Sequence, residues 1–181
     1  MFRMTSLFLM RSTVLLAVAF IIKLTYGVER IFVGETICRD CHPIQYNQCR
    51  LMKHSQAYAA LAMPESKEIA RLSGVAVDPF KSPICLGCHT TASQTDTWER
   101  DDSFYFEDGI QCEACHGRGS EYMVTETMMY KDVAIKAGLE MPGEDFCMIC
   151  HNEKGSHTAV LKVKKFNYKE ALWRLLIRER A

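Results

Sequence analysis

Apolar residues follow two patterns in this chain of 181 residues. A nearly continuous apolar run extends from Val14 to Ile22, close to the start of the chain. The closing segment FNYKEALWRLLIRER instead alternates apolar and charged residues with the 3.6-residue period of an amphipathic helix. Its apolar face is formed by Tyr168, Leu172, Leu175 and Leu176.

Proline and glycine residues delimit the other predicted helices. Pro43 begins a predicted helix over PIQYNQCRLMKHSQAYAALAM, and a second helix is predicted from Pro64 to Leu72. Another is predicted over residues 120–137, and Pro142 with Gly143 predicts a turn after it. Residues 76–83 and 90–109 are predicted as loops, with one short strand around residues 104–106. The expected fold is therefore mainly α with extensive loop, without an internal domain boundary.

The first 27 residues resemble a secretory signal peptide. Arg3 and Arg11 precede the apolar core, Lys23 follows it, and a small residue stands at Gly27. A retained membrane anchor and a buried helix are the alternatives, although the apolar run is shorter than the roughly 20 residues that span a bilayer. We expect residues 1–27 to direct export and residues 28–181 to form one periplasmic or otherwise extracytoplasmic domain. Membrane attachment is expected only if the first segment is retained.

The charges are balanced over the whole chain, with 22 lysines and arginines against 22 aspartates and glutamates. Removal of residues 1–27, which carry basic residues alone, leaves a mildly acidic chain. This distribution gives no indication of a nucleic-acid partner.

One short pattern contains most of the cysteines and histidines. It reads CRDCH at residues 38–42, CLGCH at 85–89, CEACH at 112–116 and CMICH at 147–151. These four motifs contain Cys38, Cys41, Cys85, Cys88, Cys112, Cys115, Cys147 and Cys150, together with His42, His89, His116 and His151. Cys49, His54 and His157 lie outside them.

The Cys-x-x-Cys-His pattern is typical of covalent haem c attachment. The two thiols add to the vinyl groups of the porphyrin from one helical turn, and the adjacent histidine becomes the proximal iron ligand. Two zinc sites or a set of disulfides would leave the four histidines without a role. A thioredoxin-like site is disfavoured because no strand-helix-strand pattern surrounds the cysteine pairs.

Four motifs therefore predict four haem c groups and a tetrahaem c-type cytochrome. A compact chain of this length has a radius of gyration of about 15 Å, so the four haems must pack against one another and fill much of the interior. We expect a compact multihaem cytochrome fold organised around them, with the closing helix covering the haems.

Four stretches of the chain, CRDCHPIQYNQCRLMKHSQAYAAL, GIQCEACHGRGSEY, AGLEMPGEDFCMICHN and FNYKEALWRLL, resemble the cytochrome c-554 family. The resemblance implies a tetrahaem electron carrier in which His54 is a distal iron ligand. The chain departs from the family at Cys49, where tryptophan is frequent, and at Tyr122 and Leu176–Ile177, where histidines are frequent. Cys49 is interpreted as a small buried hydrophobic residue, with a reactive thiol or an iron ligand as alternatives.

Four haem irons have eight axial positions, whereas the chain has six histidines even if His157 is a ligand. At least two positions must be filled in another way, and further copies in a homo-oligomer would not change this ratio. The candidates are an open or water-bound iron, the phenol of Tyr122, and the methionines Met52, Met63, Met123 and Met141.

Electron transfer between redox partner proteins is the function that these observations favour. The alternative is an enzyme that reduces nitric oxide, hydroxylamine or a related molecule at an open haem iron. A filament subunit or a haem-based sensor is a third hypothesis. No catalytic residue is assigned, and the sequence does not identify the electron donor or acceptor.

Overall fold

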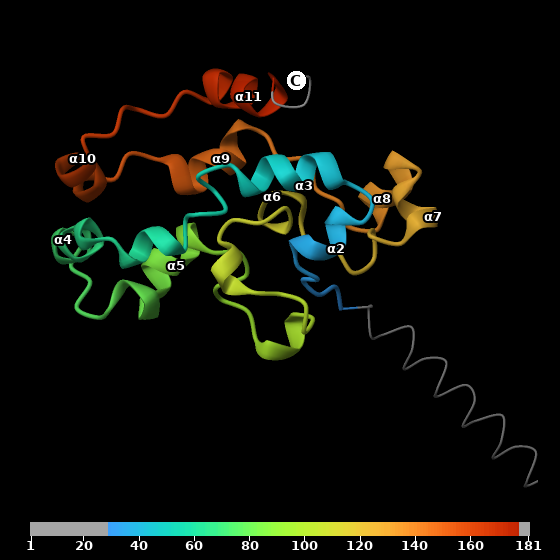
Figure 1. The fold of residues 1–181 in the computed structure, drawn as a ribbon, viewed down its shortest axis with the longest axis horizontal. Coiled ribbons are helices and arrows are strands. Elements are labelled where there is room, and N and C mark those ends of the chain that lie inside the picture. Colours follow the sequence, from blue (N-terminus) through green and yellow to red (C-terminus); the bar gives the residue numbers. More distant parts are fainter. Residues whose placement is uncertain (1–28, 178–181) are drawn as a thin grey trace, which may run out of the picture.

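The computed structural model describes residues 29–177, which are mainly helical with long connecting loops (Figure 1). The α-helices are α2 (Glu35–Arg39), α3 (Pro43–Arg50), α4 (Pro64–Leu72), α5 (Pro83–His89), α6 (Glu113–His116), α7 (Thr125–Met128), α8 (Lys131–Lys136), α9 (Glu144–His151), α10 (Gly155–Leu161) and α11 (Tyr168–Ile177). Single 3₁₀ turns occur at Ala59–Ala62, Pro79–Lys81, Thr97–Glu99 and Phe106–Asp108. The predicted fold class, mainly α with extensive loop, is confirmed.

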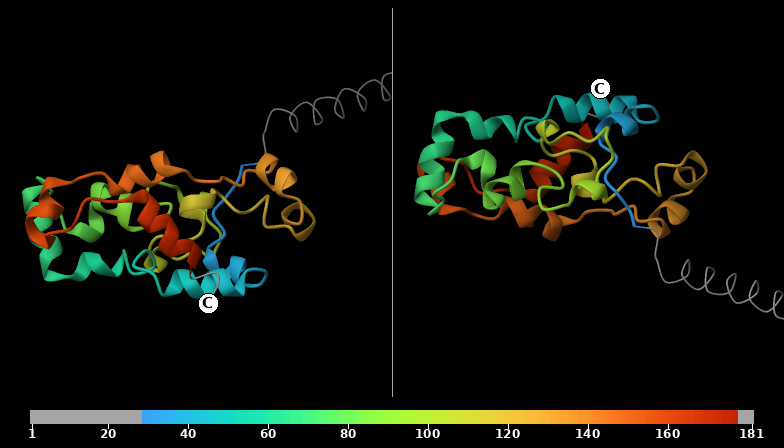
Figure 2. Two further views of the ribbon diagram at one scale, coloured as in Figure 1. Left: turned by 90° about the horizontal axis from the view of Figure 1, so that it is seen from above. Right: turned by 90° about the horizontal axis from the view of Figure 1, so that it is seen from below.

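The helices form two long sides with a central group between them. Helices α2, α3 and α4 follow one side, and α9 and α10 follow the other (Figure 2). Helices α5 and α6 lie between these sides, and α11 runs diagonally across them (Figures 1 and 2). Helices α4 and α10 pack together at one end. This arrangement brings helices that are distant in the sequence around one interior space.

Several predicted elements agree with the structure. Helix α4 spans the predicted Pro64–Leu72, and α11 forms the predicted closing helix. Pro142 and Gly143 directly precede α9, but they do not form the predicted turn. The segment 1–27 predicted to direct export lies outside the described residues. Within the described residues, none of the helices has the length and apolar character needed to cross a membrane.

The helix predicted over residues 43–63 is wrong in its length, because α3 ends at Arg50. The hydroxyl of Ser55 donates to the carbonyls of Arg50 and Met52, at 3.0 and 2.9 Å. Such side-chain bonds compete with the helical ladder, and the chain continues in turns as far as Ala59. The early end of α3 directs His54 away from the helix axis and toward the interior cavity described below.

The predictions for residues 104–106 and 120–137 are also wrong in part. Phe104 is buried but lies in a loop, and the only β pairing among residues 29–177 is an isolated bridge between Phe32 and Arg100. Residues 120–137 form the short helices α7 and α8 instead of one helix, because Tyr130 has an extended conformation between them.

Hydrogen bonds fix the first described residues to the centre of the molecule. The amide of Phe32 donates to Glu99 O at 2.8 Å, and the hydroxyl of Ser103 donates to Val33 O at 2.8 Å. Gly34 has a φ of 83°, and a Cβ there would lie 2.7 Å from Ser103 O. Glycine is therefore required at this close approach of two backbone segments.

The apolar core of the described polypeptide is small. Six hydrophobic side chains are buried, namely Val33, Leu61, Ala70, Phe104, Tyr122 and Ala134. Many large hydrophobic side chains are exposed to the surface or to the interior cavity, including Ile84 at 74 % and Ile149 at 62 %, which stand beside motif cysteines. A domain of this size normally buries far more apolar surface, so the polypeptide alone does not complete its core.

Candidate haem sites

Each Cys-x-x-Cys-His motif lies on a helical turn, as the sequence predicted. The second and fourth motifs are the C-terminal ends of α5 and α9, and the third is completed by α6. In the first motif the amide of His42 donates to Cys38 O at 2.8 Å, and in the third the amide of His116 donates to Cys112 O at 2.9 Å. The i and i+3 positions share a helix face, so each turn presents both thiols on one side.

The motifs meet one another in pairs. The thiols of Cys38 and Cys112 lie close enough to shift each other's pKa, so the first and third motifs are neighbours. The thiol of Cys150 lies 3.9 Å from Gly87 O and is hydrogen-bonded to Cys88, which brings the fourth and second motifs together. The third and fourth motifs are also neighbours. Burial raises the pKa of Cys115 and the charge of Cys147 raises it further, which indicates that the two thiols are close.

His54 faces the histidine of the fourth motif. The Nε2 atoms of His54 and His151 are 3.5 Å apart, and their ring centroids are 5.8 Å apart. Two imidazoles on opposite sides of one metal ion, with metal–nitrogen bonds of about 2.0 Å, would have these nitrogens about 4 Å apart. The two rings are thus close to the separation that binding of one iron requires.

His157 faces the histidine of the second motif. The ring centroids of His157 and His89 are 6.4 Å apart, with an interplanar angle of 30°. His157 is on α10, and the packing of α10 against α4 keeps this helix beside α5. Both histidines outside the motifs are therefore paired with a motif histidine that is distant in the sequence.

Backbone carbonyls orient two of the motif histidines. Nδ1 of His89 is 2.7 Å from Ala57 O, and Nδ1 of His116 is 3.0 Å from Glu140 O. When Nδ1–H donates to a carbonyl, Nε2 is left as the metal-binding nitrogen, which is the usual arrangement of ligating histidines. Burial lowers the pKa of His54, His151 and His157, and this favours the neutral imidazole that binds metals.

Phe166 stacks on His151, with ring centroids 4.3 Å apart and an interplanar angle of 15°. Phe166 precedes α11 and packs on the flat face of the His151 ring. His54 approaches the same ring at its Nε2 atom. Sequence reasoning did not identify Phe166, because nothing in its local pattern distinguishes it from other aromatic residues. Its role depends on the path of the chain between α10 and α11.

A cavity of about 990 Å³ connects three of the motifs. This volume is at the upper end of the range for small-molecule sites. Its lining includes Cys88, Cys115, Cys147, Cys150, His54, His89, His151 and His157. The donor set fits haem c: paired thiols on helical turns, neutral imidazoles in facing pairs, and a mostly apolar wall where the polypeptide core is incomplete.

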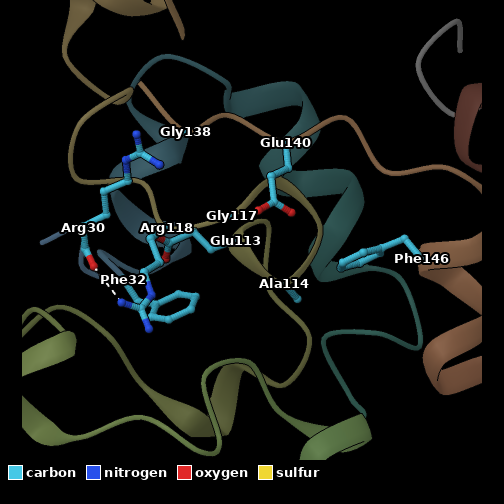
Figure 3. A pocket seen from close by; sticks show the side chains of 9 residues that line it. All are labelled: Arg30, Phe32, Glu113, Ala114, Gly117, Arg118, Gly138, Glu140 and Phe146. Carbon is cyan, nitrogen blue, oxygen red and sulfur yellow. Dashed lines mark hydrogen bonds between the residues drawn. The ribbon is translucent and has the colours of Figure 1, made fainter. Parts of the chain in front are cut away.

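A smaller cavity of about 300 Å³ lies beside the third motif (Figure 3). Arg30 and Arg118 are at one end of it, and the guanidinium of Arg118 lies 5.1 Å from the centre of the Phe32 ring. Arg118 also forms an ion pair with Glu99. Guanidinium groups at this position are suited to carboxylates, such as those that project from a porphyrin edge.

Glu113, inside the third motif, is a structural carboxylate that sequence reasoning missed. It is 2 % exposed and accepts hydrogen bonds from the amides of Val33, Gly34 and Gly119, at 2.7–3.1 Å. Burial raises the pKa of this carboxyl. Its position between two motif cysteines was visible in the sequence, but two of its three partners, Val33 and Gly34, come from a segment about 80 residues earlier.

Tyr122 is not placed as an iron ligand. It is 5 % exposed, its hydroxyl donates to Gly117 O at 2.8 Å, and burial raises its pKa above the ordinary value. The phenol is therefore neutral and engaged in a structural hydrogen bond. Met63, Met123 and Met141 have exposed side chains, whereas Met52 and Cys49 are partly buried.

The alternatives to haem receive no structural support. All nine cysteines are free thiols, so the disulfide framework is not formed. Among residues 29–177, no three side chains of cysteine, histidine, aspartate or glutamate are grouped to hold one bare metal ion, as a zinc site would require.

Residues 37–117 match the family model described as cytochrome c554 and c-prime. This region contains the first three motifs, and the match supports a c-type cytochrome, the class that binds haem c covalently. Over these residues the chain is similar to the cytochrome c-554 family, which agrees with the resemblance of its first and third motifs. No curated protein and no solved structure gives a match to the chain.

Proposed function

We propose that this protein is an exported tetrahaem c-type cytochrome that carries electrons between redox partner proteins outside the cytoplasm. The observation that carries the proposal is the convergence of the second, third and fourth Cys-x-x-Cys-His turns on one interior cavity, with the first motif beside the third. The basic and apolar segment 1–27 supports export, and c-type cytochromes are assembled outside the cytoplasm.

Haem c supplies reversible one-electron chemistry at iron when it is bound. The eight motif cysteines would hold four haems through thioether bonds, and His42, His89, His116 and His151 would be the proximal ligands. His54 would be the distal ligand opposite His151, and His157 the distal ligand opposite His89, which the two facing pairs support.

The contacts between motifs support a linear order of electron transfer. The first motif meets the third, the third meets the fourth, and the fourth meets the second. Electrons would then enter and leave at the first and second motifs. His42, at the first motif, is exposed, which is consistent with access by a partner at that end.

The number of haems is tested by counting haem and mass in the same preparation. We expect four haems per chain and a mass that lacks residues 1–27. The double substitution Cys112→Ser and Cys115→Ser should lower the count to three, because only the third motif loses its attachment thiols. The matched control, Cys49→Ser, should retain four haems. A wild-type count below four, or loss of a haem in the control, would contradict the assignment.

A second candidate function is supported by the histidine pairing. Neither His42 nor His116 has a ring contact or hydrogen bond with another histidine among the described residues. Haem irons at the first and third motifs could therefore be open on one side, and an open iron can bind nitric oxide or hydroxylamine. The test is steady-state turnover of these molecules with an artificial electron donor. A rate no faster than that of free haem would exclude the enzyme and leave the carrier.

A further inference from the structure

Glu35, the first residue of α2, is a buried carboxylate with an unusual environment. Its side chain is 1 % exposed. Oε1 accepts a hydrogen bond from Arg50 Nη1 at 2.8 Å, but Oε2 is buried without any hydrogen-bond partner among the described residues. The amide of Glu35 donates to Gln111 Oε1 at 3.0 Å, which holds the residue in place. A buried oxygen of this kind is costly as an anion, whereas a proton on Oε2 removes most of that cost.

The single neighbouring cation does not neutralise Glu35 completely. Arg50 Nη1 also donates to Asp108 at 2.8 Å, so that one guanidinium serves two carboxylates. Burial raises the pKa of Glu35, the hydrogen bond from Arg50 lowers it, and the charge of Asp108 raises it again, with a net increase. Among the described residues, Arg50 and Asp108 act electrostatically on Glu35, and Glu35 acts in turn on Cys38, Cys49 and Cys112.

The charge of Glu35 reaches two of the haem-attachment motifs. Its electrostatic effect extends to the thiols of Cys38 in the first motif and Cys112 in the third. Cys38 is also one helical turn after Glu35 in α2. A change of charge at either motif therefore changes the proton affinity of this carboxylate. By linkage, protonation of the carboxylate changes the free energy of that charge to the same extent.

We propose that Glu35 is a proton-binding site whose occupancy is coupled to electron uptake at the first and third motifs. This inference rests on the proposed function. An electron from a one-electron donor converts ferric to ferrous iron, and the Glu35 carboxylate takes one proton from solvent to form the carboxylic acid. One O–H bond forms on Glu35 while one breaks in a hydronium ion of the solvent, and the net charge of the buried region stays constant. Asp108, 21 % exposed and bonded to the same guanidinium, connects the site with solvent.

The sign of the effect follows from electrostatics. Reduction removes one positive charge near Glu35, so its proton affinity is higher in the reduced protein than in the oxidised one. Between the two pKa values, each rise of one pH unit makes reduction tenfold less favourable, which corresponds to about 59 mV for a one-electron step. Outside this window the reduction potential does not depend on Glu35.

The test is a spectroelectrochemical titration of the holoprotein at a series of pH values. For wild type we expect at least one haem potential to fall with pH, and for Glu35→Gln that fall should disappear. The exposed control Glu107→Gln should keep it. Arg50→Ala should move the window to higher pH, because loss of the cation raises the proton affinity of Glu35. This variant remains informative if Glu35→Gln does not fold.

An infrared difference spectrum between reduced and oxidised protein provides a second readout. A carboxylic-acid C=O band should appear on reduction of wild type and be absent in Glu35→Gln. An unchanged pH dependence in Glu35→Gln, or an unchanged window in Arg50→Ala, would overturn the inference. Haem counts on the same samples separate this result from a failure of the proposed function, which would show as fewer than four haems.

Discussion

Substitution His54→Ala should convert one haem per chain from a closed to an open iron. The Nε2 atom of His54 is 3.5 Å from that of His151, and the pairing leaves only one distal histidine for the fourth motif. In the variant the reduced protein should bind carbon monoxide at one additional haem, about a quarter of the haem signal, with a higher reduction potential at that iron. Absorption spectra scaled to haem content measure the change.

The control for this experiment is the exposed Lys67→Ala, outside the cavity lining, which should bind carbon monoxide as wild type does. Added imidazole should restore the low-spin spectrum of His54→Ala, because it can occupy the position of the missing side chain. An unchanged carbon monoxide titration in His54→Ala would show that His54 is not an iron ligand. The same comparison with His157→Ala tests the second pair.

Substitution Glu113→Ala should lower the free energy of unfolding by about 3 kcal/mol or more. The carboxylate accepts hydrogen bonds from three buried backbone amides, those of Val33, Gly34 and Gly119. Each amide left without an acceptor costs about 1–3 kcal/mol. Loss of these bonds also frees the first described segment from the third motif. Denaturant unfolding of the holoprotein measures the effect, and the exposed Glu107→Ala should change stability by less than about 0.5 kcal/mol.

The difference in unfolding free energy between wild type and Glu113→Gln should depend on pH. Because burial raises the pKa of Glu113 in the folded protein, the folded state holds this proton more tightly than the unfolded state does. The resulting stabilisation is complete below the ordinary glutamate pKa of about 4.3 and is lost as the pH rises through the folded value. The stability of wild type relative to Glu113→Gln should therefore decline with rising pH. A constant difference would contradict the raised pKa.

The period of apolar residues and the positions of proline and glycine were sufficient to predict the helices whose ends are determined by local sequence. Pro64 and the amphipathic pattern after Asn167 predicted α4 and α11. The helix predicted across residues 43–63 failed because Ser55 bonds back to two carbonyls, and a serine side chain has several such choices that the sequence does not decide.

The cofactor chemistry was determined by the sequence alone, since a Cys-x-x-Cys-His turn contains every group that attachment and proximal ligation need within five residues. The pairing of His54 with His151 and of His157 with His89 was decided only by tertiary structure, because it joins segments as far as 97 residues apart. The same is true of the contact between Glu35 and Gln111 and of that between Glu113 and Val33, which join residues 76 and 80 positions apart. Haem attachment depends on residues that are adjacent in the chain, so the sequence reveals it. Distal ligation and carboxylate burial depend on which distant segments the fold brings together.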